Sequence, residues 1–256
     1  MDTESTFGLY EVLAILGASA WLPQLVVFIS KKFSKPKLTI IPDKDVEIGF
    51  TSLGPIFNIQ IAFLAEKKKA LIKKAEIELT HENNDTQKFT WDWFEETLHE
   101  VNVPNSGLIP TRKNQKAIAI NIEPDSLVEK KIGFHLNSFK EDRLKLVQLT
   151  TEEYLNIYNA GDDINQIRTR NTFNNLKDLY KNSFNWKVGN YKARIITGLS
   201  DGQNFESNVS FQLTSLNIKT LELNINMAQQ IVERDYGAEV EVENQWFWVN
   251  TIAKSD

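Results

Sequence analysis

The chain has 256 residues, with 34 acidic and 29 basic side chains and a formal net charge of −5. A general nucleic-acid binder needs a basic face that releases counterions, so this balance predicts no direct contact with nucleic acid. The sequence contains no cysteine, which excludes disulfide bonds, thiolate zinc sites and cysteine nucleophiles.

An apolar run near the N-terminus, residues 7–30, predicts a transmembrane helix. At about 1.5 Å per residue, a helix of this length covers the roughly 30 Å hydrocarbon core of a bilayer. Two alternatives are a cleaved export signal that ends at Ala20 and a fully buried core helix. The acidic residues Asp2 and Glu4, and the apolar residues that continue after Ala20, disfavour the export signal.

Basic residues flank only one side of this run, and they set its predicted orientation. Short loops that carry Lys or Arg stay on the cytoplasmic side of the membrane. We therefore expect a single-pass protein of the inner membrane with an extracytoplasmic tail at residues 1–6, a basic linker at 31–37 and a cytosolic domain at 38–256. The lysines that are predicted to contact lipid headgroups are Lys31, Lys32, Lys35 and Lys37.

Several residues inside the run bear on what the predicted span does beyond anchoring. Glu11 is either an interfacial carboxylate that reaches outward or a group that lines a pore or pairs with a partner. A patch of small residues would let a second helix approach closely, and Pro23 would kink the helix below it. The span is therefore predicted to form homo-oligomers through this patch, which comprises Gly17, Ala18 and Ser19, with Ala20 beside them.

After the lysines, apolar and polar residues alternate along several short segments. Residues 57–63 show the pattern clearly, with apolar side chains at every second position and Asn58 and Gln60 between them. This period of two, with turn residues between segments, predicts antiparallel hairpins. Helices are predicted near 151–181, after a capping sequence that begins at Thr150, and near 215–234, followed by a last strand.

The stretch that contains Trp186, Gly189 and Tyr191 resembles the last strands of immunoglobulin-like sandwiches, and the resemblance extends over about residues 37–213. The chain departs from that family in lacking the cysteine pair and in carrying helical insertions. The predicted fold class is an N-terminal transmembrane helix, then a mainly-β, immunoglobulin-like sandwich with helical insertions, and a C-terminal helix plus strand. Single-pass membrane-anchored proteins with such a cytosolic domain are the group that the chain resembles.

Two short segments match catalytic motifs, but neither has the surroundings that its motif requires. The G-x-S-x-G match at residues 198–202 precedes a strand rather than a helix, and all three histidines come before Ser200. Asp43 and Glu66, followed by lysines, match the PD…ExK pattern of metal-dependent nucleases, but the acidic net charge offers no track for phosphates. No dinucleotide or P-loop fingerprint occurs. We therefore predict no enzyme activity, no cofactor and no metal site.

The C-terminal region supplies the candidates for a contact surface. If residues 215–234 form one helix throughout, a second apolar stripe lies on the side away from the core stripe. The terminal strand adds aromatic residues that either close the core or mark a contact surface. The predicted partner-interface residues are Leu216, Leu223, Met227, Ile231, Trp246 and Trp248.

These observations predict a membrane-anchored, non-enzymatic protein whose cytosolic β-domain binds a protein partner and which self-associates. One alternative is a membrane-permeabilising effector of a prokaryotic antiviral defence system that is activated by a cytosolic sensor, an analogy of architecture only. The other alternative is a nuclease of the PD…ExK type.

Overall fold

The computed structural model describes residue 8 and residues 21–29, 35–103, 107–238, 241 and 245–255. Its strands are β1 (Lys37–Thr51), β2 (Gly54–Glu66), β3 (Ala70–His81), β4 (Thr86–Val103), β5 (Gly107–Lys116), β6 (Ile120–Ile122), β7 (Ser126–Leu136), β8 (Gly189–Leu199), β9 (Asn204–Leu213), β10 (Trp248–Ile252) and β11 (Lys254–Ser255). The helices are α2 (Asn137–Ala160), the 3-10 helix η1 (Ile164–Thr169), α3 (Asn171–Asn182) and α4 (Ser215–Asp235).

The eleven strands form one sheet that curves until its two edges meet. The path runs β10-β1-β2-β7-β4-β3-β8-β9-β11, and β5 and β6 pair with β4 and β3 beside this path. β10 pairs with β1, and β11 pairs with β9. Because only Ala253 separates β10 from β11, the end of the chain joins the first and last strands of the path and nearly closes the sheet.

Side chains fill the inside of the curved sheet. Alternate residues of β2 point inward because successive side chains of a strand lie on opposite faces. In a small closed sheet, side chains of this kind occupy the whole interior. The inward residues of β2 are all at most 1% exposed, namely Phe57, Ile59, Ile61 and Phe63.

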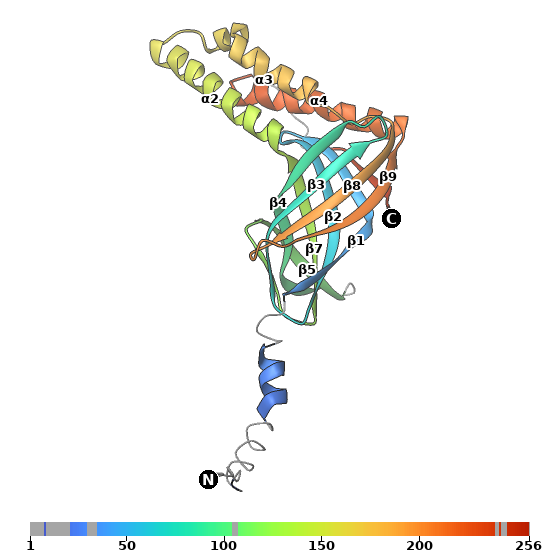
Figure 1. Ribbon diagram of the computed structural model, residues 1–256. Helices are drawn as coiled ribbons and strands as arrows, with labels where there is room; N and C mark the ends of the chain where they lie inside the picture. The colour runs from blue at the N-terminus through green and yellow to red at the C-terminus, as the bar shows by residue number, and fades with distance from the viewer. Residues whose placement is uncertain are drawn as a thin grey trace, which may run out of the picture.

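The helices α2, α3 and α4 lie together across one end of the sheet (Figure 1). Phe139 of α2 contacts Phe50 of β1 with ring centroids 6.5 Å apart, and it contacts Tyr180 of α3 at 5.5 Å. These aromatic contacts join the interior of the sheet to the helical layer. The helix at residues 21–29, blue in Figure 1, lies beyond the opposite end of the sheet, and all its residues are exposed.

The mainly-β character expected from the sequence is confirmed, but the predicted fold class is wrong in two respects. The strands form one nearly closed sheet rather than the two stacked sheets of an immunoglobulin-like sandwich. The period of two shows which face of a strand is apolar but not which strand lies beside it. Among the described residues, no helix has the length and apolar content needed to cross a bilayer, which corrects the predicted transmembrane helix.

The helices within the domain also differ from expectation. α2 begins at Asn137, directly after β7, and not near residue 151. Thr150 lies inside this helix, where its hydroxyl donates to the Leu146 carbonyl at 2.8 Å instead of capping a helix start. After α3, residues 184–188 lie outside any strand, and β8 starts at Gly189.

Candidate functional site

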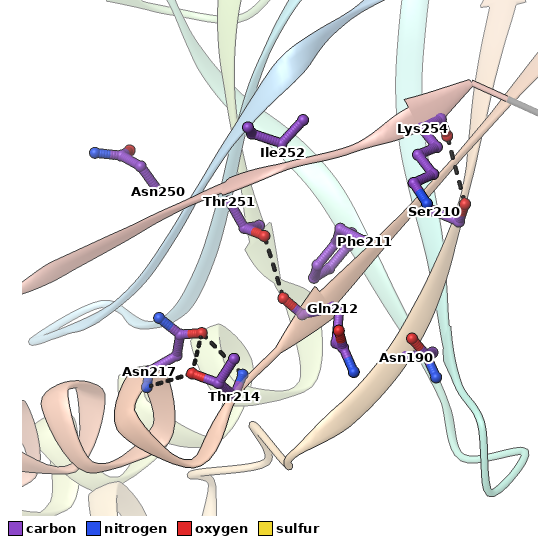
Figure 2. Close-up of a pocket in the computed structure, with 10 residues that line it drawn as sticks. All are labelled: Asn190, Ser210, Phe211, Gln212, Thr214, Asn217, Asn250, Thr251, Ile252 and Lys254. Atoms are coloured by element: carbon purple, nitrogen blue, oxygen red, sulfur yellow. Dashed lines mark hydrogen bonds between the residues drawn. The ribbon is translucent and has the colours of Figure 1, made fainter.

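The edges of the sheet meet at a seam where main-chain pairing is short. β8 and β9 pair over ten residue pairs, whereas β11 pairs with β9 only at Lys254–Ser210 and Ser255–Val209. Beside these pairs, side chains hold the edges together. The Thr251 hydroxyl donates to the Gln212 carbonyl at 3.1 Å, and the Ser210 hydroxyl donates to the Lys254 carbonyl at 3.4 Å (Figure 2). The seam is therefore closed by side chains as much as by main-chain hydrogen bonds.

A groove of about 530 Å³ lies over the seam, and we call it the seam groove. Figure 2 shows the start of α4 at one end of the groove and β11 at the other, with β9 between them. Its lining is rich in amides and hydroxyls, with two apolar side chains and one lysine. The ten residues are Asn190, Ser210, Phe211, Gln212, Thr214, Asn217, Asn250, Thr251, Ile252 and Lys254.

The start of α4 is fixed in the groove by a capping box. The Asn217 amide N–H donates to the Thr214 hydroxyl at 3.3 Å, and the Thr214 amide N–H donates to the Asn217 side-chain oxygen at 2.8 Å. Reciprocal bonds of this kind satisfy two main-chain donors that a helix start otherwise leaves unpaired. The capping box therefore holds both side chains in one position at the end of the groove.

Phe211 is the aromatic residue of the groove lining, and other rings pack behind it. Phe211 is buried and stacks on Tyr191 of β8 with ring centroids 5.2 Å apart, and it also contacts Phe57 at 5.7 Å. Burial raises the pKa of Tyr191, whose hydroxyl donates to the Lys187 carbonyl at 3.1 Å. The aromatic contacts add no charge to the groove, and Lys254 contributes the one charged side chain among the ten lining residues.

Four exposed apolar residues lie on α4 and at or next to β10, two elements that contribute to the groove, and we call them the apolar rim: Leu216, Leu223, Phe247 and Ile252. Ile252 is 73% exposed and lines the groove itself, and Leu216, 71% exposed, precedes the lining residue Asn217. Leu223 follows Leu216 by two helical turns on the same face of α4. The buried Asn224 side chain accepts from the Phe247 N–H at 2.9 Å and donates to the Phe247 carbonyl at 2.7 Å. These two bonds tie the rim residue Phe247 to α4.

Most groups that line the groove form hydrogen bonds and carry no charge, with Lys254 as the exception. A side-chain amide both donates and accepts, so several amides in one groove match the donors and acceptors of a polypeptide main chain. An apolar rim beside such polar groups is the composition of protein interfaces, which combine apolar contacts with a polar surround.

Of the partner-interface residues predicted from the sequence, some are exposed in the structure and others are half-buried or packed against the core. Leu216 and Leu223 are exposed, whereas Met227 and Ile231 on the same helix are half-buried. Trp246 packs against the core, and Trp248 covers Gly49, where a Cβ atom would lie 2.2 Å from the indole ring. The groove amides were missed, because an isolated Asn or Gln in a strand carries no signal of its own.

The residues predicted to act at the membrane lie mostly outside the described part of the chain. This applies to Glu11, Gly17, Ala18, Ser19, Lys31 and Lys32. Pro23 is in the helix at residues 21–29, and Lys35 precedes β1. Lys37 is the first residue of β1, and its ammonium group lies 3.0 Å from the Glu66 carboxylate rather than standing unpaired.

The residues of the two catalytic motif matches do not come together. In the β1–β2 hairpin Glu66 pairs with Lys37, so Asp43 is six strand residues away, about 20 Å along β1. Ser200 lies in the turn between β8 and β9, with its N–H donating to the Leu71 carbonyl at 2.9 Å. Among the residues that the structure describes, no group of acidic or histidine side chains is arranged to hold a metal ion.

Comparison of the chain with protein-family models, with curated proteins and with solved structures finds no match.

Proposed function

We propose that this chain is a non-enzymatic protein that binds a polypeptide partner at the seam groove and its apolar rim. The observation that carries the proposal is the interrupted ladder at the seam, which lies directly beside exposed apolar side chains. In the described chain, β10 pairs with β1 alone, and β9 pairs with β11 over two residues. Strand edges that are not joined by a continuous main-chain ladder present donors and acceptors, and a polypeptide is the ligand that matches such groups along a line.

The side chains support the same kind of partner. The amides of Asn190, Gln212 and Asn250 come from three different strands and reach one groove. A small charged ligand would need several charged groups to hold it, whereas the lining supplies only Lys254. The apolar rim adds contacts that a polypeptide side chain fills. The lining of the seam groove therefore suits a polypeptide segment that is uncharged and partly apolar.

The proposal is tested by placing a photo-crosslinking phenylalanine analogue at Ile252 in the full chain, within its host cells. A matched position is Leu127 of β7, which is 54% exposed and lies in a strand that is fully paired with β2. We expect position 252, but not 127, to capture one polypeptide, either another protein or a second copy of this chain. Equal capture from both positions would contradict the proposal.

The captured polypeptide is then purified and its affinity for full-length variants is measured. Ile252→Asp and Leu216→Asp place a charge in the interface, so each should weaken binding about tenfold or more. The control Leu127→Asp makes the same kind of change away from the groove and should leave the affinity unchanged. If all three variants bind like the wild type, the seam is not the binding surface.

A further inference from the structure

A second cavity lies within the helical layer, away from the seam groove. It is a cleft of about 360 Å³ between α2, α3 and α4, at the lower end of the roughly 300–1,000 Å³ usual for small-molecule sites. Its walls are mainly apolar, with Val147, Leu176 and Val232 among the lining residues. The polar groups that enter it are few and come from all three helices. This combination is the usual form of a site for a small organic ligand.

The charged group of the cleft is Arg143, on the second turn of α2. Its Nε donates to the Tyr180 hydroxyl at 3.0 Å, and that hydroxyl donates to the Ser52 carbonyl at 3.1 Å. These bonds fix the guanidinium against the cleft wall. In the described part of the chain no carboxylate lies within ion-pair distance of Arg143, although the side chain is half-buried. A guanidinium has five N–H donors, so its terminal nitrogens are free to bind an anion bidentately.

Hydroxyl groups and one acid complete the polar part of the cleft. The Tyr236 hydroxyl donates to the Val147 carbonyl at 3.2 Å and lies 3.0 Å from the Thr151 hydroxyl. Asp235 also lines the cleft, and its carboxylate is 3.1 Å from the Arg234 guanidinium. Arg234 therefore offsets part of the negative charge that Asp235 would otherwise direct at an anion near Arg143.

Specific polar and aromatic contacts between the helices keep the cleft open. Lys177 of α3 and Glu233 of α4 form an ion pair, and the Gln229 side chain donates to the Lys177 carbonyl at 3.1 Å. Tyr236 contacts Tyr154 with ring centroids 5.7 Å apart. The walls of the cleft are thus positioned before any ligand enters, which lowers the entropy cost of binding.

We propose that this cleft binds a small amphipathic anion, with its carboxylate or phosphate head on Arg143 and its apolar body between α2, α3 and α4. The charge of Arg143 selects the head, and the aliphatic and aromatic walls select the body. The site is independent of the seam groove, so either proposal can fail without the other.

The test is calorimetric titration of the full chain with three ligands that share one tail: octanoate, octyl phosphate and octan-1-ol. We expect at least one anion to bind about tenfold or more tightly than the alcohol, the range given by a hydrogen bond to a charged group. The comparison of octanoate with octyl phosphate shows which head the cleft prefers. Equal binding of all three ligands, or no binding of any at millimolar concentration, would overturn the proposal.

Four variants locate the site, each checked for folding by circular dichroism. Arg143→Gln should weaken binding of the anion about tenfold or more, whereas the control Lys145→Gln, an exposed residue of the same helix, should not. Asp235→Asn should strengthen binding because it removes a negative charge from the cleft. Ile231→Trp, at a half-buried lining position, should block the cleft and abolish binding even if the Arg143 variant does not fold. Equal effects of the Arg143 and Lys145 variants would show a nonspecific charge effect and overturn the proposal.

Discussion

The β2–β7 wall and the seam are two parts of one sheet that are held together differently. The wall has ten residue pairs in unbroken register, from Ile56–His135 to Ala65–Ser126. The seam has two pairs between β9 and β11, and hydroxyl side chains supply the neighbouring bonds. At one end of the wall, the outward residues Asn58 and His135 are buried, whereas Leu127 at its other end and Ile252 at the seam are exposed. The two regions therefore differ in main-chain pairing rather than in exposure alone, and the proposed binding surface lies where the pairing is incomplete.

The largest expected effect comes from the inner side of the wall. Phe134 and Phe57 are directly opposed on β7 and β2, and both are 0% exposed. Phe134→Ala should lower the free energy of unfolding by about 3–5 kcal/mol, because it leaves a cavity in a filled interior. Chemical denaturation measures this loss. The exposed seam residue Ile252, replaced by Ala, should change stability by less than about 0.5 kcal/mol, and equal losses at the two positions would remove the distinction between wall and seam.

A smaller effect is expected from the hydroxyl that bridges the seam. Thr251→Val keeps the shape of the side chain but removes the hydrogen bond to the Gln212 carbonyl. The free energy of unfolding should fall by about 1 kcal/mol, the usual net contribution of one hydrogen bond. The matched control is Thr220→Val in α4, where the lost bond to the Leu216 carbonyl lies within one helix. If the two variants lose the same stability, the Thr251 hydroxyl has no special role in closing the sheet.

The smallest effect concerns the outer side of the wall and appears as a pH dependence. His135 is 4% exposed, and burial lowers its pKa, although the negative charge of Asp92, 3.6 Å from Nδ1, opposes the shift. The unfolded chain therefore takes up a proton at a higher pH than the folded chain does. Stability due to this group is complete above about pH 6.5 and is lost as the pH falls through the lower, folded-state pKa.

Replacement of His135 by Gln removes this titration. Denaturation midpoints between about pH 7.5 and about pH 5 should thus fall less steeply for His135→Gln than for the wild type. Identical slopes for the two proteins would show that His135 is protonated equally well in the folded and unfolded chains.

The strands were predictable from the sequence, and their arrangement was not. The alternation at residues 57–63 identifies β2 and its inward face because the period of two is local. The partner of β2 is β7, and Ile56 pairs with His135 across a long stretch of intervening chain. No local pattern specifies such a pairing, so an open sandwich and a nearly closed sheet look alike at the level of single strands.

The site was predictable only in its apolar part. Leu216 and Leu223 lie on a face of α4 that does not pack in the core. Their spacing along the sequence indicates this helical stripe. The amides of the groove meet only after β8, β9 and β10 are placed side by side, which the sequence does not determine. The location at the inner membrane, the self-association and the antiviral effector role stay predictions from the sequence.

The most direct test of the seam as a binding surface is amide hydrogen exchange on the full chain, with and without the polypeptide captured from position 252. We expect slower exchange in segments that contain residues 210–214 and 248–254, because a bound polypeptide covers the seam groove and the strand edges beside it. Exchange across the β2–β7 wall should not change. Protection that appears at the wall and is absent from both seam segments would contradict the account.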